Sequence, residues 1–359
     1  MAHWAVILAG GRGERFWPLS TSKHPKQLLE LIGDRSMMGM AIDRLEGVVD
    51  PSRILVITNA DLVDATCDTA PELPRENVIG EPFGRDTAAA VALAAAIVRK
   101  RDASGTFCIL TADHVIGGLD LFRATLQEGL DLASREDVLI TIGITPTEPA
   151  TGYGYIHAGD SLETSGEVSF LKAQSFVEKP DLETAKGYLS EGGYYWNAGM
   201  FIWSVDSVAK AFRSFVPALA DLIDTLEASV DTPQFADALE QAYTPLERIS
   251  IDYALMERAT NIVMAVGAFP WDDVGAWPAV ERHFEPDDQG NTGLGDVVTI
   301  DATNNIVYSG GRLTALIGVD DLIVVQAEGV TMICPKDRAQ DVKKMVLQLR
   351  DSGAHQDLL

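Results

Sequence analysis

Short apolar runs that alternate with helix-length segments constrain the fold of this chain more than any other feature. The expected strands lie at residues 5–8, 54–58, 107–111 and 138–143, and the helices between them at 88–101 and 121–133. Such alternation is typical of βαβ units around a mostly parallel sheet. Because ligands bind beyond the carboxyl ends of strands in these sheets, we expect the chemistry in the loops that follow the runs.

The second half of the chain has a different pattern. Amphipathic helices are expected after residue 206, at residues 208–215, 219–228 and 235–242. Short β-rich pieces follow at 297–300, 305–308, 314–317, 322–326 and 330–334, and a final helix at 339–350. With 359 residues, a large domain and a small one are the natural division. We therefore predict a catalytic domain at 1–285 and a C-terminal β module with a terminal helix at 286–359.

Charge and cysteine content narrow the class of protein. The chain has 28 Lys and Arg residues against 53 Asp and Glu residues, for a net charge of −25. This charge disfavours nucleic acid and anionic membranes as partners. The start of the chain lacks the pattern of a signal peptide, and the longest apolar run, 88–98, is shorter than the roughly 20 residues that span a bilayer. The three cysteines have no CxxC spacing, so we predict free thiols and a cytoplasmic location.

The loop after the first expected strand, residues 9–15, is rich in glycine and has a basic character. Glycines let backbone N–H groups surround an anion. Four basic residues and one acid lie in or just after this loop, namely Arg12, Arg15, Lys23, Lys26 and Glu14. A Rossmann fingerprint would need glycine at Phe16, and a phosphate loop would need a Gly-Lys-Ser/Thr that is absent. The pattern favours a polyanion ligand, with a merely solvated basic loop as the alternative.

Two separated aspartates are candidates for a metal site. Asp113 follows an expected strand, and Asp273 lies in the Gly-containing segment 271–277. Magnesium takes one or two carboxylates together with phosphate oxygens and water, although either aspartate can also serve a turn or helix cap. The six histidines have no metal-ligand spacing, and no nucleophile elbow is present. Direct displacement at phosphorus is the chemistry that fits these residues.

Several blocks together resemble the mannose-1-phosphate guanylyltransferases of the sugar-nucleotidyltransferase family. The signature is LAGGRGERFWPLS at residues 8–20 with HPKQL at 24–28. Further blocks are EPFGRDTA at 81–88, DHVI at 113–116, TGYGYI at 151–156, FVEKP at 176–180, WNAGMFIW at 196–203, WDDVGAW at 271–277, GVDDLIVV at 318–325 and CPKD at 334–337. The resemblance covers nearly the whole chain. It implies a Rossmann-like α/β nucleotidyltransferase domain with a mixed, mostly parallel sheet and a C-terminal module like a left-handed β-helix.

The resemblance also implies residue roles. Arg15 and Lys26 would grip the triphosphate, and Asp113 and Asp273 would hold Mg²⁺. The nucleotide would contact Leu8, Ala9, Gly10, Gly11, Arg12, Gly13, Glu81 and Asp113. The sugar phosphate would contact Gly152, Tyr153, Glu178, Lys179, Asn197 and Gly199. The substrates implied are GTP and mannose 1-phosphate, the products GDP-mannose and pyrophosphate, and the assembly a homodimer.

Two departures from the family pattern and two rival functions stand beside this hypothesis. The family commonly has Asn where this chain has Asp86, for which a helix N-cap is an adequate role. The longer members carry an isomerase domain, which we do not expect here. The rivals are the same chemistry on another sugar 1-phosphate and nucleoside triphosphate, and a non-catalytic sensor of GDP-sugars.

Overall fold

The computed structural model describes residues 3–327 and 329–359, and these divide into two compact units. Unit 1 comprises residues 3–10, 41–112 and 116–271, and unit 2 comprises residues 11–40, 113–115 and 272–359. The chain therefore passes repeatedly between the units. Helix α1 (Met37–Asp43) and strands β5 (Val115–Ile116) and β11 (Trp271–Asp272) lie at these passages.

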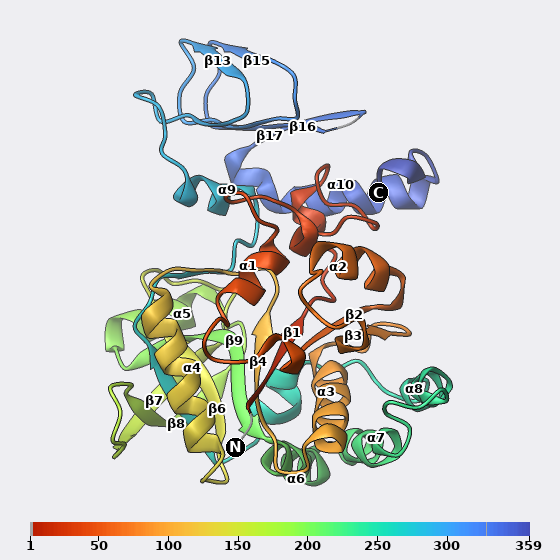
Figure 1. The fold of residues 1–359 in the computed structure, drawn as a ribbon. Helices are drawn as coiled ribbons and strands as arrows, with labels where there is room; N and C mark the ends of the chain where they lie inside the picture. The colour runs from red at the N-terminus through yellow and green to blue at the C-terminus, as the bar shows by residue number, and fades with distance from the viewer. Residues whose placement is uncertain (1–2, 328) are drawn as a thin grey trace. The chain divides into compact units, whose positions relative to one another are not determined.

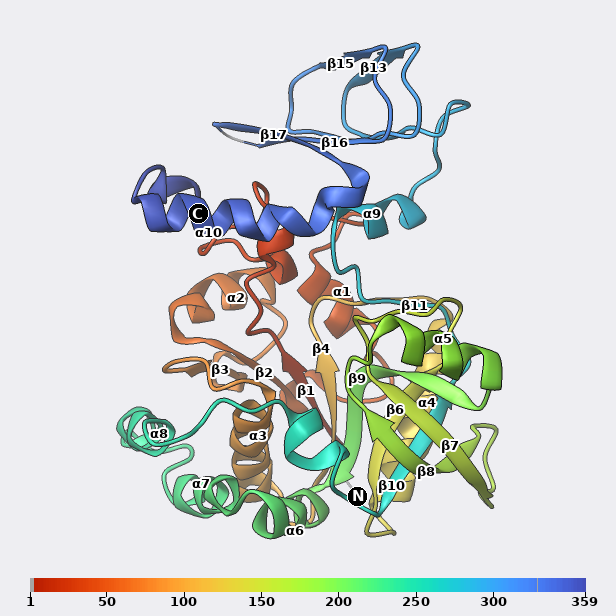
Figure 2. The same ribbon diagram turned by 180° about the vertical axis from the view of Figure 1, so that it is seen from behind.

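Unit 1 is built on a mixed sheet whose order among the described residues is β3-β2-β1-β4-β9-β6-β10-β8-β7. Its strands are β1 (His3–Leu8), β2 (Ile54–Asn59), β3 (Val78–Glu81), β4 (Thr106–Thr111), β6 (Leu139–Ile144), β7 (Tyr155–Leu162), β8 (Phe170–Val177), β9 (Tyr194–Ser204) and β10 (Ile262–Gly267). The pairings β3-β2-β1-β4 are parallel, whereas β9 runs antiparallel to both β4 and β6. Strands β7 and β8 form an antiparallel hairpin (Figure 2).

Helices cover both faces of this sheet (Figure 1). They are α2 (Val63–Thr69), α3 (Thr87–Arg101), α4 (Leu119–Ala133), α5 (Leu182–Glu191), α6 (Val205–Phe215), α7 (Pro217–Glu227) and α8 (Phe235–Tyr243), with short turns η3 (Pro51–Arg53), η4 (Ala60–Leu62) and η5 (Arg75–Asn77) and a π-helical turn η6 (Asp252–Met256). On one face, α3 packs between the sheet and α6 and α7, and residues 88–98 are all buried. A helix enclosed in this way needs no polar stripe, which explains its run of alanines.

Unit 2 combines the segment after the glycine loop with the C-terminal residues. Its helical turns are η1 (Glu14–Phe16), η2 (Lys26–Leu28), α9 (Trp277–Val280), η7 (Glu281–His283), η8 (Lys336–Asp341), α10 (Val342–Ser352) and η9 (Gln356–Leu358). Phe16, Leu29 and Trp277 share a buried core with Ile323 and Val346. The N-terminal loop is thus packed against the C-terminal elements within one core.

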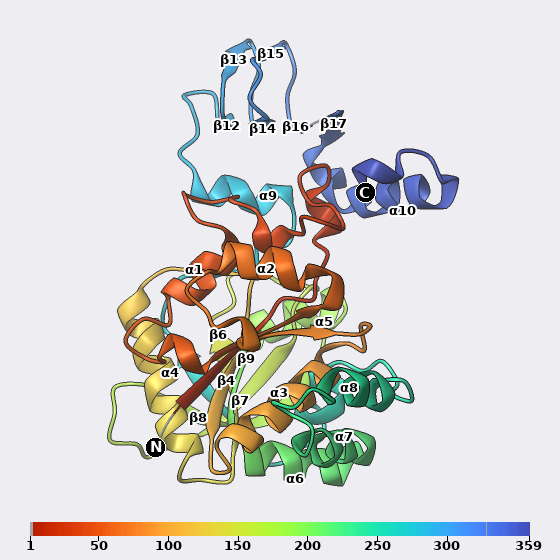
Figure 3. The same cartoon turned by 45° about the vertical axis from the view of Figure 1, so that its right-hand side comes forward.

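The C-terminal strands form a coil of parallel rungs (Figure 3). They are β12 (Thr292–Leu294), β13 (Val297–Ile300), β14 (Ile306–Ser309), β15 (Thr314–Ile317), β16 (Leu322–Ala327) and β17 (Val330–Pro335). Strands β12, β14 and β16 stack in parallel, and β17 completes their sheet by pairing antiparallel with β16. Strands β13 and β15 form a second, parallel sheet. At one corner the buried Asn305 donates to Asn291 Oδ1 at 2.9 Å and accepts from the Leu322 N–H at 2.9 Å. This asparagine ladder satisfies backbone groups that the turns leave unpaired.

The structure confirms the predicted mixed sheet and the β-helix-like module. The parallel pairs of the mixed sheet are β3-β2-β1-β4 and β6–β10, whereas β9 and the β7–β8 hairpin introduce antiparallel neighbours. The predicted division at residue 285 follows the linear sequence, whereas the packing units are not contiguous in sequence. The handedness of the coil stays a prediction. None of the helices in the described residues is long and apolar enough to cross a membrane, and the three cysteines are free thiols.

Candidate active site

Lys26 is the centre of the charged site in unit 2. Its side chain is buried, with 3% of the residue exposed. The ammonium donates to the Asp113 carbonyl at 2.8 Å, to Asp113 Oδ2 at 3.0 Å and to the Asp273 carbonyl at 2.9 Å. Because an ammonium has three donors, this lysine joins both candidate metal-binding segments and satisfies all its hydrogen bonds within the protein. Its predicted grip on the triphosphate stays a prediction and would require it to exchange a partner.

The glycine loop packs directly against this lysine. Gly13 has a φ of 63°, which favours glycine, and a Cβ placed there would lie 2.3 Å from Lys26 Cβ. The Gly13 carbonyl accepts from the Ser20 hydroxyl at 2.6 Å and from the Phe16 N–H at 2.8 Å. The loop glycine is therefore required for close packing as well as for backbone conformation.

The Asp113 carboxylate is both ionised and accessible. Burial alone would raise the pKa of Asp113, but the Lys26 ammonium, His114 and hydrogen bonds outweigh it, so the pKa lies below its ordinary value. The side chain is nevertheless 41% exposed. An ionised, accessible carboxylate is the type of ligand that a hard cation takes.

The two neighbouring aspartates of the segment 271–277 have different surroundings. Asp272 is buried; its Oδ1 accepts from the Val274 N–H at 2.8 Å and its Oδ2 lies 3.1 Å from His283 Nε2. These contacts hold Val274, whose φ is 45°. Asp273 contributes its carbonyl to Lys26 and is only partly buried. Asp272 is accordingly structural, and Asp273 remains the candidate metal ligand.

The basic charge of the loop is not cancelled by its single acid. Glu14 pairs with Arg350 of α10 at 2.8 Å. Arg12 and Arg15 are exposed to solvent. Because Arg350 neutralises Glu14, the loop keeps a positive charge. A binding site for a polyanion requires such a charge.

The first nucleotide-site residues lie in unit 1, at the ends of β1 and β3. The Ala9 N–H donates to the Ile57 carbonyl at 2.8 Å, and the Leu8 carbonyl accepts from the Ala112 N–H at 3.1 Å. A Cβ on Gly10 would lie 3.7 Å from Glu81 Oε2. Leu8, Ala9, Gly10 and Glu81 are therefore brought together as the resemblance implies.

Glu81 is a buried acid with an unusual protonation equilibrium. Burial raises the pKa of Glu81 to about 7, although the hydrogen bond from Tyr243 at 3.1 Å opposes the rise. A buried carboxyl that is protonated near neutrality can change its charge when a ligand arrives. Its role in nucleotide binding stays a prediction.

The Glu81 carboxyl should make protein stability depend on pH. Its pKa is raised from 4.5 to about 7 on folding, so the folded state binds the proton more tightly. The free energy of unfolding is expected to fall by up to about 3 kcal/mol as the pH rises between these two values. Glu81→Gln keeps an acceptor for Tyr243 but removes the titration. Urea midpoints at pH 5 and pH 8 should differ less in the variant than in the wild type, and equal differences would contradict this account.

Asp86 caps helix α3. Its side chain accepts from the Thr87 N–H at 2.8 Å, and its φ is 70°. Asp and Asn cap helices about equally well. The predicted N-cap is confirmed.

Asn197 is the most rigidly oriented residue of the candidate sugar site in unit 1. Its Oδ1 accepts from the Thr141 hydroxyl at 2.9 Å and from the Gly199 N–H at 3.2 Å. Its Nδ2 donates to Asp252 Oδ1 at 3.0 Å. The amide oxygen faces two donors and the amide nitrogen faces a carboxylate, so these contacts fix the orientation of the amide.

Glu178 and Lys179 form an ion pair at the end of β8. Glu178 Oε1 lies 2.5 Å from Lys179 Nζ, and the Glu178 side chain is 8% exposed. Its Oε2 is buried without a hydrogen-bond partner among the described residues. A buried carboxylate oxygen without a donor is costly unless a ligand supplies one.

Aromatic rings accompany these polar groups. Tyr153 packs edge-on against Trp196, with ring centroids 5.1 Å apart, and against Trp271 at 5.3 Å. Gly152 precedes this tyrosine and is exposed. Aromatic surfaces beside hydrogen-bonding groups suit a ring with hydroxyl groups.

Three further residues of this group have no predicted role in the sequence. Asp252 lies in the turn η6, Thr141 within β6, and Gly154 has its Cβ position only 2.4 Å from Glu178 Oε2. Gly154 belongs to the block at 151–156 that marks the family resemblance. Asp252 carried the weaker signal of a single acid in the apolar stretch 249–256.

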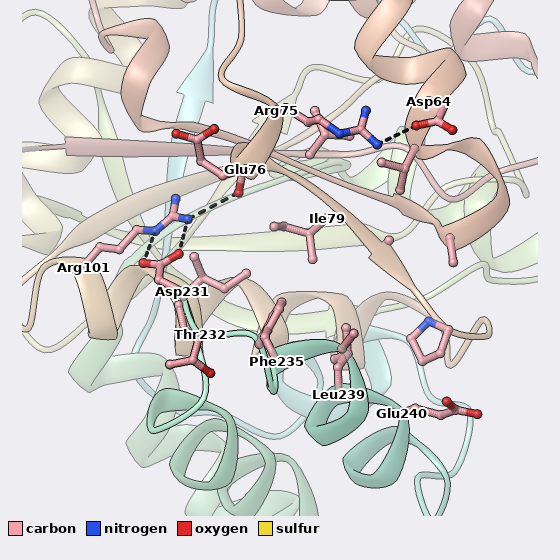
Figure 4. A pocket seen from close by; sticks show the side chains of 18 residues that line it. Asp64, Arg75, Glu76, Ile79, Arg101, Asp231, Thr232, Phe235, Leu239 and Glu240 are labelled. Carbon is pink, nitrogen blue, oxygen red and sulfur yellow. Dashed lines mark hydrogen bonds and ion pairs between the residues drawn. The ribbon is translucent and has the colours of Figure 1, made fainter.

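A separate pocket of about 650 Å³ lies in unit 1 between β3 and α8 (Figure 4). Ile79, Phe235 and Leu239 give it an apolar lining. Its arginines are paired, Arg101 with Asp231 at 2.7 Å and Arg75 with Asp64 at 2.6 Å. With both cations neutralised, this pocket does not match a phosphate ligand.

Two family models match the chain and together cover most of its length. Residues 4–289 match the family described as "Nucleotidyl transferase", and residues 295–349 match the "MannoseP isomerase/GMP-like beta-helix domain". The chain is a member of the nucleotidyl transferase family.

Individual relatives define the family more closely. The chain is 36% identical to the mannose-1-phosphate guanylyltransferase of Escherichia coli (strain K12), over 98% of this chain and 74% of that protein. It is 36% identical to the xanthan biosynthesis protein XanB of Xanthomonas campestris pv. campestris (strain B100), over 97% of this chain and 73% of that protein. The crystal structure of mannose-1-phosphate geranyltransferase from Thermus thermophilus has a TM-score of 0.87 and 34% identity, covering 98% of this chain and 100% of that one. The chain belongs to the mannose-1-phosphate guanylyltransferases.

Proposed function

We propose that the protein transfers GMP from GTP to mannose 1-phosphate, giving GDP-mannose and pyrophosphate. The observation that carries this proposal is the cluster of Lys26 with Asp113 and the Asp273 carbonyl. It joins three distant segments in the arrangement expected of a site for phosphoryl chemistry. The Escherichia coli relative, named a mannose-1-phosphate guanylyltransferase, supports the choice of substrates.

The reaction is an in-line attack by a phosphate oxygen of mannose 1-phosphate on the α-phosphorus of GTP. The nucleophile is already ionised at neutral pH, so the protein need not supply a general base. The barrier is the approach of two polyanions, and the protein lowers it by positioning and charge neutralisation. Arg12 and Arg15 supply exposed positive charge, and the loop 10–13 offers backbone N–H groups.

Mg²⁺ is the cofactor that these residues fit. Asp113 and Asp273 would hold it, and it would neutralise charge on the phosphates. Among the described residues no group of three or more His, Cys, Asp or Glu is arranged to hold a metal. Two carboxylates completed by phosphate oxygens and water are typical of magnesium rather than of a structural metal.

A substrate panel tests the proposed function. Purified protein is incubated with Mg²⁺ and each nucleoside triphosphate against mannose 1-phosphate and glucose 1-phosphate, and pyrophosphate release is followed. Release with GTP and mannose 1-phosphate is expected. Release only with another pair would change the substrates but keep the chemistry, and GDP-mannose binding without release would identify a sensor.

The homodimer and the location also remain proposals. Free thiols and the sugar-nucleotide substrates support a cytoplasmic location. For the dimer, the support is the outer face of β13 and β15, where Ile300 is paired with Ile317 and the two are 55% and 69% exposed. Adjacent exposed apolar side chains of this size are typical of an interaction surface.

Charges on the β13–β15 face should dissociate the dimer. The double variant I300K/I317K is expected to elute as a monomer at micromolar concentration, because two lysines cannot be buried against their own copies. Leu121→Lys is the matched control, since Leu121 is also exposed but lies on α4. Light scattering after gel filtration gives the mass. A monomeric wild type, or a double variant that remains dimeric, would contradict this assignment.

A further inference from the structure

One oxygen of the Glu178 carboxylate makes no hydrogen bond to the described residues of the protein. Lys179 occupies Oε1, whereas Oε2 is buried with no partner among the described residues. The glycine at residue 154 makes room for Oε2 itself, because a Cβ there would lie 2.4 Å from that oxygen. The oxygen is therefore an acceptor that can be satisfied by a donor from outside the protein.

Asp252 is the second acid of this group. It lies at the start of η6, a single π-helical turn, a feature frequent at functional sites. Its Oδ1 accepts from Asn197 Nδ2 at 3.0 Å, so Asp252 faces the same asparagine that the resemblance assigns to the sugar. The Asn197 amide cannot rotate away, because Thr141 and Gly199 hold its other end.

The surroundings of Asp252 favour its protonated form. Burial raises the pKa of Asp252 to about 6, and the Glu178 carboxylate adds to the rise, whereas Lys179 and Asn197 oppose it. Glu257 accepts from the Glu178 N–H at 3.1 Å and adds a third acid, and Tyr253 is the neighbouring ionisable group. Three acids with one lysine form a group that a proton or a hydroxyl donor stabilises.

From this geometry we infer that Asp252 is a further specificity-determining residue, which with Glu178 forms a carboxyl pair that binds neighbouring hydroxyls of the sugar ring. A protonated carboxyl donates and an ionised one accepts, and each sugar hydroxyl can do both. A site built to hydrogen-bond hydroxyls rejects rings that present them in another orientation, because its buried groups then stay unpaired. This inference rests on one part of the proposed function, the binding of a mannosyl group, and does not depend on the transfer of GMP.

The test compares Asp252→Asn with wild type and with Asp206→Asn, a matched exposed aspartate in the first turn of α6. KM for mannose 1-phosphate is expected to rise by about 10-fold or more in Asp252→Asn. KM for GTP should stay within about 2-fold in both variants, since a lost sugar contact does not touch the nucleotide. Thermal unfolding confirms that the variants are folded, and Asp252→Ala provides a second variant that cannot hold Asn197.

A binding measurement separates this inference from the proposed function. The affinity for GDP-mannose is measured by calorimetry at pH 5.5 and 7.5, because this ligand does not titrate in that range. The ratio of wild-type to Asp252→Asn affinity should change between the two pH values, since only the wild type can lose the Asp252 proton. If wild type releases no pyrophosphate but this ratio changes, the proposed function fails and the inference stands. Unchanged KM for the sugar phosphate with an unchanged affinity ratio, or equal rises in both KM values, would overturn the inference.

Discussion

Asp113→Asn is expected to lower kcat by roughly 1000-fold while leaving the protein folded. The asparagine keeps an oxygen for the Lys26 ammonium, now 3.0 Å from Asp113 Oδ2, but removes the negative charge that a divalent cation requires. Activity at saturating substrate and its dependence on Mg²⁺ concentration are the measurements. Asp120→Asn, an exposed acid in the first turn of α4, is the matched control.

The ionisation of Asp113 makes this result independent of pH near neutrality. Its pKa is lowered on folding, so the stability that the carboxylate contributes is present above the ordinary value of 3.8 and is lost as the pH falls below it. The variant should therefore be inactive across the neutral range. Wild-type activity in folded Asp113→Asn would remove the metal-ligand assignment.

Lys26→Met should affect both stability and activity. It leaves two carbonyls and the partly exposed Asp113 carboxylate without the buried ammonium, and the loss of such a donor destabilises by about 1–3 kcal/mol. We expect kcat to fall by at least about 100-fold. The reason is that Lys26 hydrogen-bonds both the segment that carries Asp113 and the segment that carries Asp273, and the variant loses these bonds. Urea unfolding and steady-state kinetics measure the two effects.

Two further variants distinguish the roles of this lysine. Lys23→Met, at an exposed position three residues earlier, should leave both stability and rate near wild type. Lys26→Arg should not restore activity, because the larger planar group does not fit a buried site with three convergent acceptors. Wild-type stability with a raised KM for GTP in Lys26→Met would instead show that the lysine mainly binds the triphosphate. Unchanged stability and rate would contradict both roles.

The sequence predicted much of the fold because its elements have strong local signals. Helices α6, α7 and α8 and strands β13 and β15 were expected close to their observed bounds, since apolar spacing and turn residues define them locally. For the antiparallel strands β8 and β9, the sequence offers family blocks but no local strand prediction. Their pairing depends on contacts between distant residues, such as Ile109 with Phe201, that no local pattern contains.

The sequence predicted the residues of the candidate site that lie in recognisable motifs. It did not predict the contacts that depend on tertiary packing. Asp113 and Asp273 were singled out by their positions after apolar runs. That Lys26 would be buried with three protein acceptors depends on tertiary structure, because a lysine next to a glycine loop is usually exposed. Asp252 was not predicted for the same reason, because only its hydrogen bond with Asn197 shows that it lies beside the candidate sugar site.

Isotope transfer tests the central claim most directly. Mannose 1-phosphate with ¹⁸O in its non-bridging phosphate oxygens is incubated with GTP, Mg²⁺ and the protein, and the products are examined by mass spectrometry. Attack by this phosphate on the α-phosphorus predicts GDP-mannose that retains all of the label, together with an equal amount of unlabelled pyrophosphate. Label in pyrophosphate or free phosphate, or no GDP-mannose at all, would contradict GMP transfer by this protein.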